Sequence, residues 1–303
     1  EVSDVEIFRD GKTYSLDTVK YFFSVYPDDE LYFLIGGDSF EHFDEWHCPA
    51  EILQYVTLAV AARGNGISDG AKQHFRDTYG KDFVPVDFTP DFVSSADIRL
   101  RYQFGLPTSD VPQAVDEYVR KHNLYTQYRA MADKLRPYLT EKRFMHTFHV
   151  VKRGLELCTA EEYDKVFVTC LLHDCAKYLS PDRYADYGFV RPCDMPDSVV
   201  HAFLGALVAE KDFGVTDNEI LNAIRYHCTA RPNMTRLDKI VYVADKTEET
   251  RPYPLSHLLC GTLDEMFVKC LFEANRYCLT NHAGNVYYLT SQALDFYKNQ
   301  ANA

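Results

Sequence analysis

Six residues of types that commonly bind metal ions recur at regular intervals in the second half of the sequence. They are His146, His173, Asp174, His201, His227 and Asp245. Successive gaps are 27 residues (146 to 173), 28 (173 to 201), 26 (201 to 227) and 18 (227 to 245). A gap near 27 is about one helical hairpin, so each side chain can return to the same end of a helical bundle. The series predicts a cage of metal ligands.

The donor types indicate which ions and which chemistry the cage suits. Mixed imidazole and carboxylate ligands favour a divalent ion such as iron, with manganese and cobalt as alternatives, whereas structural zinc more often has thiolate ligands. Six ligands exceed the usual protein share of one ion. Asp174, directly after His173, can bridge two ions ~3.5–4 Å apart, the separation that two-metal phosphoryl hydrolysis uses. A single histidine is more often an ordinary core or surface residue, but the ordered series favours two ions.

The elements that must position these ligands are helices. Hydrophobic periodicity predicts helices and no strong strand in the second half, at residues 111–122, 127–137, 143–157, 161–177, 197–211, 217–228 and 235–249. The first half instead alternates short β-like runs with helical segments, one capped by Ser15 and one between Ser39 and Tyr55. The β-like runs are Val5–Phe8, Leu31–Ile35 and Tyr55–Ala62. This alternation predicts a parallel sheet, and we expect domains at 1–125 and 126–303.

Composition limits the class of protein. The 303 residues are 46% hydrophobic and 25% charged, as expected for two globular domains. A net charge of −13 argues against nucleic acid or an anionic membrane as partner. Nine cysteines without a Cys-x-x-Cys pair, and no apolar run near the ~20 residues of a membrane span, predict a cytoplasmic protein. Because the chain starts at Glu1 and not at Met, we expect a preceding segment.

The second half resembles a known family. The motifs that carry the resemblance are Arg143–His146, Leu171–Lys177, His201, Ala223–His227, Arg231–Met234, and Tyr242–Asp245 with Glu248 and Arg251. Together they resemble the HD-domain phosphohydrolases, and more narrowly the YqeK-like symmetrical dinucleoside tetraphosphatases. The resemblance implies an all-α bundle that hydrolyses diadenosine tetraphosphate to two ADP, with water activated at a two-ion centre. Asp174, Lys177 and Arg231 would be catalytic, the two cations meeting phosphate oxygens.

The first half resembles another family. Leu31–Asp38 is an apolar strand that ends in two glycines and an acid, and Ser94 with Asp97 can cap a helix that carries Arg99. With Lys12–Thr18 and Trp46, these features resemble the Rossmann-like bacterial nicotinate mononucleotide adenylyltransferases of NAD biosynthesis. The resemblance implies that Ser94, Ser95 and Arg99 hold ATP phosphates, that Gly36 and Asp38 hold adenosine, and that Trp46 stacks on the pyridine ring of nicotinate mononucleotide.

The chain departs from the second pattern in one respect. It contains no His-x-Gly-His motif, whose histidines stabilise the transferring phosphoryl group in that family. We therefore expect an incomplete half-domain and no synthesis of nicotinate adenine dinucleotide by these 303 residues. An alternative is that the helical half hydrolyses another nucleotide phosphoester while the first half is a non-catalytic nucleotide-binding or dimerisation module. A homodimer is left open by the sequence.

Overall fold

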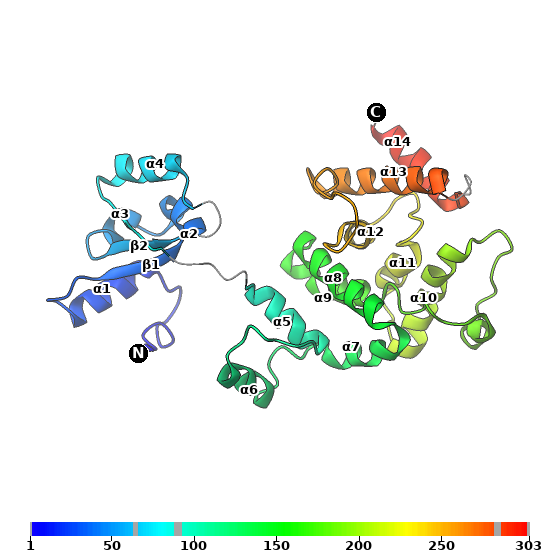
Figure 1. Cartoon of the computed structure of the whole chain (residues 1–303), viewed down its shortest axis with the longest axis horizontal. Helices are drawn as coiled ribbons and strands as arrows, with labels where there is room; N and C mark the ends of the chain where they lie inside the picture. Colours follow the sequence, from blue (N-terminus) through cyan, green and yellow to red (C-terminus); the bar gives the residue numbers. More distant parts are fainter. Residues whose placement is uncertain (1, 63–65, 88–92, 282–285, 302–303) are drawn as a thin grey trace. The chain divides into compact units, whose positions relative to one another are not determined.

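The chain forms two compact units, which divide between residues 92 and 93. The computed structural model describes residues 2–62, 66–87, 93–281 and 286–301 (Figure 1). The division lies upstream of the predicted domain boundary at 125/126, so residues 93–125 pack with the helical unit. That boundary, at which the two family patterns meet in the sequence, stays a prediction.

The first unit contains a parallel sheet, as predicted. Its strand order is β1-β2-β3, and Leu34 pairs with Ala59 across β1 and β2. β1 and β2 confirm two of the β-like runs, whereas the two-residue β3 is not among the predicted runs. The elements are α1 (Ser15–Val25), β1 (Tyr32–Gly36), α2 (Gly37–Glu41), the 3₁₀ helix η1 (Phe43–Glu45), α3 (Pro49–Ile52), β2 (Thr57–Ala61), α4 (Asp69–Tyr79) and β3 (Val84–Pro85).

The core of this unit lies between the sheet and its helices. Successive strand side chains point to opposite faces, so in β2 Leu58 and Val60 are buried while Thr57 is exposed. Phe40 and Phe43 pack against Phe75 of α4. The sheet therefore has a continuous apolar core, with three strands in the part of the chain that the structure describes.

Two local expectations for this unit are wrong. Val5–Phe8 forms turns instead of a strand, with the Ile7 amide donating to the Asp4 carbonyl at 2.8 Å. No strand among the described residues pairs with this segment, so its β propensity has no partner to act on. Ser15 is the first residue of α1 and not its cap; Tyr14 holds the N-cap position without a side-chain capping bond.

Among the described residues of the second unit, all regular secondary structure is helical, which confirms the predicted helices, although the one expected at 161–177 ends at Leu172 (Figure 1). No helix in those ranges is both long and apolar enough to cross a membrane. The elements are α5 (Ser95–Phe104), α6 (Gln113–Lys121), α7 (Arg129–Leu135), η2 (Arg136–Tyr138), α8 (Glu141–Leu157), η3 (Ala160–Glu162), α9 (Tyr163–Leu172), η4 (Pro181–Tyr187), α10 (Asp197–Phe213), α11 (Asn218–Tyr226), α12 (Arg236–Thr247), α13 (Leu263–Asn281) and α14 (Tyr288–Ala301).

The close packing of α8 and α9 places two of the predicted ligands. Gly154 of α8 lies where a Cβ atom would meet Cys170 Sγ at 2.7 Å and Val166 Cγ1 at 3.0 Å. Only glycine lets the two helices approach this closely. Thr140 begins α8 by accepting a hydrogen bond from the Arg143 amide at 3.3 Å. His146, on the first half of α8, lies near His173, which follows the end of α9.

Helix α5 joins the core of the helical unit. As the sequence predicts, Ser94 caps its N-terminus by accepting a hydrogen bond from the Asp97 amide. Gly105 ends the helix in the left-handed conformation with φ of 64°. Phe104 is fully buried against Phe144 and Phe148 of α8. This contact explains why residues 93–125 belong to the second unit.

Candidate metal centre

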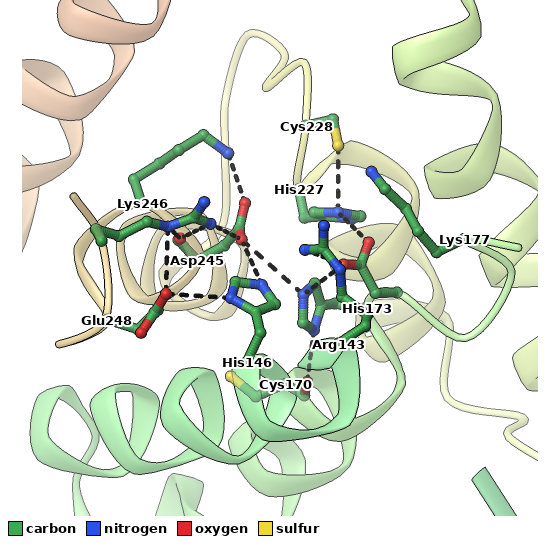
Figure 2. Close-up of polar contacts among 12 residues, drawn as sticks. Arg143, His146, Cys170, His173, Lys177, His227, Cys228, Asp245, Lys246 and Glu248 are labelled. Carbon is green, nitrogen blue, oxygen red and sulfur yellow. Dashed lines mark hydrogen bonds and ion pairs between the residues drawn. The ribbon is translucent and has the colours of Figure 1, made fainter. Parts of the chain in front are cut away.

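All six predicted ligands are buried in the second unit. His146 projects from α8, His201 from α10 and Asp245 from α12, whereas His173 and Asp174 directly follow α9 and His227 directly follows α11. Figure 2 shows the side chains of His146, His173, His227 and Asp245 turned toward one another. The structure therefore brings together residues up to 99 positions apart (146 to 245).

The two histidines at helix ends share one local arrangement. The last carbonyls of a helix have no partner within it. His173 Nδ1 donates to the Cys170 carbonyl and His227 Nδ1 donates to the Ile224 carbonyl, both at 2.7 Å. A carbonyl can only accept, so Nδ1 of each ring carries a proton, and Nε2 of each ring faces the interior of the cage. Metal-binding histidines are commonly oriented in this way.

The ligand atoms form two groups that meet at Asp174. In the first group, His146 Nε2 lies 3.2 Å from Asp245 Oδ1, and His173 Nε2 lies 3.4 Å from Asp174 Oδ2 and 4.0 Å from Asp245 Oδ1. In the second group, Asp174 Oδ1 lies 3.0 Å from His201 Nε2 and 3.7 Å from His227 Nε2. Asp174 thus faces one group with each carboxylate oxygen, as a bridging ligand must.

Neighbouring cations hold the two carboxylates in place. Arg143 Nη1 lies 3.0 Å from Asp174 Oδ2, and Asp245 accepts from Lys246 Nζ at 2.7 Å and from Arg251 Nη2 at 2.6 Å. Burial opposes ionisation of Asp174 and Asp245, but the surrounding imidazoles and, for Asp245, Lys246 and Arg251 keep both pKa values well below the usual range. Both carboxylates are therefore ionised and ready to bind a cation.

The remaining electrostatics favour neutral, metal-binding histidine at His173. Burial of this ring lowers its pKa, because the charged form loses hydration. Glu248 lies 3.2 Å from His146 Nδ1. Burial raises the pKa of Glu248, but hydrogen bonds from His146 and the Thr250 amide outweigh burial and lower it to about 2. Glu248 thereby orients the ring of His146, as the carbonyls orient those of His173 and His227.

Three atoms of the cage have unmet bonding capacity. His146 Nε2, His173 Nε2 and Asp174 Oδ1 are buried and have no hydrogen-bond partner with suitable geometry among the described residues. Buried polar atoms without a partner are rare and costly. Bound divalent ions would satisfy all three, and the donor set of imidazole nitrogens and carboxylate oxygens fits iron, manganese, cobalt or zinc. The residues present therefore fit a two-ion centre.

The two predicted phosphate-binding cations have different surroundings. Lys177 Nζ, in the turn that follows α9, lies 3.1 and 3.3 Å from the two ring nitrogens of His201, at the margin of the cage. Arg231 Nη2 instead bonds to the buried Asp238 at 2.8 Å, and its guanidinium lies 5.1 Å from the centre of the Tyr226 ring. Lys177 thus faces the ligands, whereas Arg231 has a structural partner.

Two residues at the cage were not assigned a role from the sequence. Cys228 Sγ lies 3.3 Å from His201 Nε2 and 3.2 Å from His227 Nε2, and the only signal was its place beside His227. Lys246 was also missed, although it directly follows Asp245. A lone residue beside a ligand is uninformative until the fold shows that its side chain turns inward.

The predicted nucleotide-binding residues are divided between the two units. Gly36 ends β1, Asp38 is exposed at the start of α2, and Trp46 packs against Phe33 and Phe43, a contact that also explains it as a core residue. Ser94, Ser95 and Arg99 lie at the start of α5 in the second unit. Ser94 and Arg99 line a pocket of about 760 Å³ with Lys152 and Tyr163.

Comparisons with known proteins agree with this geometry. A family profile for the HD domain matches residues 143–250, which contain all six ligands. A probable nicotinate-nucleotide adenylyltransferase/Ap4A hydrolase of Mycoplasma genitalium is 29% identical over 82% of this chain and 69% of its own length. A symmetrical bis(5'-nucleosyl)-tetraphosphatase of Halalkalibacterium halodurans is 32% identical over 40% of this chain and 68% of its own length.

A solved structure supports the same relationship. The crystal structure of a predicted HD superfamily hydrolase involved in NAD metabolism, from Clostridium acetobutylicum, superposes with a TM-score of 0.53 and 26% identity. The superposition covers 57% of this chain and 98% of the Clostridium acetobutylicum chain. The ligand cage, the family match and these relatives together show that the chain belongs to the HD-domain hydrolases, in the branch of the symmetrical bis(5'-nucleosyl)-tetraphosphatases, and that a nicotinate-nucleotide adenylyltransferase-like region precedes its HD domain.

Proposed function

We propose that the second unit hydrolyses diadenosine tetraphosphate symmetrically to two ADP. The observation that carries this proposal is the set of buried, unpartnered ligand atoms that converge on Asp174. The printed activities of the Mycoplasma genitalium and Halalkalibacterium halodurans relatives support the choice of substrate. In the reaction, water attacks one central phosphorus atom, and the oxygen that bridges the two central phosphorus atoms leaves with the second ADP.

The six predicted ligands would hold two divalent ions, with His146, His173 and Asp245 at one, His201 and His227 at the other, and Asp174 shared. When bound, the ions lower the pKa of a coordinated water and neutralise negative charge on the tetraphosphate. Iron is the favoured ion, with manganese and cobalt as alternatives. The local cations also offset the net charge of −13, which otherwise repels a polyphosphate.

The residues around the ligands have distinct roles. Arg143 fixes Asp174, while Lys246 and Arg251 fix Asp245, so both carboxylates are positioned before substrate binds. Lys177 lies beside His201 and is placed to contact a phosphate oxygen as a point charge. Arg231 is proposed as a second phosphate contact. To make this contact, its guanidinium has to give up a hydrogen bond to Asp238 and form one to a phosphate oxygen.

For the nicotinate-nucleotide adenylyltransferase-like region, we propose nucleotide binding through Gly36, Asp38, Trp46, Ser94, Ser95 and Arg99, with ATP and nicotinate mononucleotide as ligands. The polar groups at the capped start of α5 support a phosphate contact. Isothermal titration with ATP compares wild type with Arg99→Ala. Equal affinity in the two proteins would contradict this assignment.

The hydrolase proposal is tested by product analysis. The purified 303-residue chain is stripped of metal, reloaded with Fe²⁺, Mn²⁺ or Co²⁺, and incubated with diadenosine tetraphosphate. We expect ADP as the sole nucleotide product, and no reaction without metal. ATP plus AMP in equal amounts would show asymmetric cleavage. If diadenosine tetraphosphate is not hydrolysed but another nucleotide phosphoester is, that ester becomes the assigned substrate.

A further inference from the structure

The two ligand groups of the cage differ in one donor atom, because a cysteine sulfur lies beside the second group only. The His146–His173–Asp174 group offers nitrogen and oxygen donors, whereas the second cluster of ligand atoms is His201, His227 and Cys228. Within each cluster the ligand atoms all lie within 4.8 Å of one another. Cys228 Sγ lies 3.3 Å from His201 Nε2 and 3.2 Å from His227 Nε2, and Figure 2 shows its sulfur directed to the His227 ring.

A buried carboxylate oxygen points to the same place independently. Among the described residues, Asp174 Oδ1 has no hydrogen-bond partner with suitable geometry, and it lies 3.0 Å from His201 Nε2 and 3.7 Å from His227 Nε2. The two imidazole nitrogens are therefore each within 3.7 Å of both this carboxylate oxygen and the Cys228 sulfur. Four donors of this kind are the usual number for a tetrahedral divalent ion.

Other cysteines near the core have ordinary structural partners. Cys175 Sγ donates to the Gly205 carbonyl at 3.4 Å, and Cys158 Sγ donates to the Leu155 carbonyl at 3.5 Å. The partners recorded for Cys228 are instead the two imidazole nitrogens that face the cage. Packing explains the first two thiols, but it gives no reason for a sulfur between two metal-binding histidines.

We propose that Cys228 is a metal ligand of the second position, together with His201, His227 and Asp174. This inference rests on the proposed two-ion centre and adds a seventh ligand to it. A thiolate is a softer donor than a carboxylate, so the second position favours Zn²⁺ or Fe²⁺ over Mn²⁺ more strongly than the first position does. The two positions therefore differ in metal selectivity.

Cobalt substitution tests the sulfur ligand directly. The metal-free wild-type chain is titrated with Co²⁺ while absorbance and bound cobalt are measured, and Cys228→Ser and Cys158→Ser are treated in the same way. We expect a near-ultraviolet sulfur-to-cobalt charge-transfer band in wild type and in the matched control Cys158→Ser. In Cys228→Ser the band is absent, and the affinity for the second cobalt ion falls by about tenfold or more.

X-ray absorption of the zinc-loaded wild type gives a second readout that does not depend on how a variant folds. We expect a sulfur scatterer at about 2.3 Å from zinc. Bound metal without a charge-transfer band or a sulfur scatterer overturns the role of Cys228 and leaves the two-ion hydrolase intact, as does a band that persists in Cys228→Ser. A wild-type chain that binds no divalent ion overturns the metal centre, and the Cys228 proposal with it.

Discussion

The candidate residues of the two units differ in how they are placed. In the HD domain, His146, His173 and Asp174 are buried, and each has one polar atom without a hydrogen-bond partner among the described residues, which packing does not explain. In the adenylyltransferase-like region, Asp38 is exposed, where a charge needs no explanation, and Trp46 fills space beside Phe33 and Phe43. Burial of polar groups is costly. A buried polar group without a partner therefore indicates a functional site more clearly than an exposed or packed one does.

The largest expected effect comes from the residue shared by both ligand groups. Asp174→Asn should lose both ions and lower kcat/KM for diadenosine tetraphosphate by about ten-thousandfold or more, equivalent to about 5 kcal/mol. His149→Ala serves as the control, because His149 pairs with Glu249 outside the cage and should leave metal content and rate unchanged. Elemental analysis together with product assays measures both. Full metal occupancy in Asp174→Asn would refute the bridging role.

The next largest effect is a difference in stability between two shortened chains, which tests where the helical unit begins. Residues 93–303 should fold as a helical protein, whereas residues 126–303 lack Phe104, which is fully buried against Phe144 and Phe148. Loss of one such ring costs about 3 kcal/mol or more. The urea midpoint of the shorter polypeptide should therefore be lower, at equal metal loading. Equal midpoints would show that α5 adds no stability and would favour the boundary at 125/126.

The ligand series shows what sequence patterns could predict. The spacing of His146, His173, His201 and His227 predicted that these side chains lie together, because each gap matches a helical hairpin. Cys228 and Lys246 were missed because their contacts depend on the direction of a side chain after a helix turn, which no local pattern specifies. The wrong strand at Val5–Phe8 has a related cause, since β structure requires a neighbouring strand and a local run does not supply one.

A smaller effect distinguishes Arg231 from Lys177, the two cationic residues that are predicted to bind phosphate. Arg231→Ala leaves the buried Asp238 without its guanidinium partner and should lower the free energy of unfolding by about 1–3 kcal/mol. Lys177→Ala removes no such partner and should raise KM for the tetraphosphate at unchanged stability. Chemical denaturation and steady-state kinetics measured on both variants decide the matter. If Arg231→Ala raises KM without loss of stability, its main role is phosphate binding.

The smallest effect concerns a titratable group of the adenylyltransferase-like region. Asp44 accepts hydrogen bonds from Tyr79 and, at 2.6 Å, from His74. These bonds lower the pKa of Asp44 below its unfolded value of about 3.9. A carboxylate with a depressed folded-state pKa stabilises the fold fully above the unfolded pKa, and this contribution is lost as pH falls through the folded pKa. The side chain is 46% exposed, so solvent screening limits its contribution to less than about 1 kcal/mol.

Trp46 makes that small effect measurable in one unit alone. It is the sole tryptophan and packs against Phe43, the residue before Asp44, so its fluorescence follows unfolding of the sheet and not of the metal centre. We expect Asp44→Asn to be less stable than wild type at pH 6, and the difference to shrink as the pH falls below the unfolded pKa of about 3.9. The exposed Asp10→Asn changes net charge equally and should match wild type across this pH range. If Asp10→Asn shifts the curve as much as Asp44→Asn, overall charge and not the Tyr79 and His74 contacts sets the acid stability of this unit.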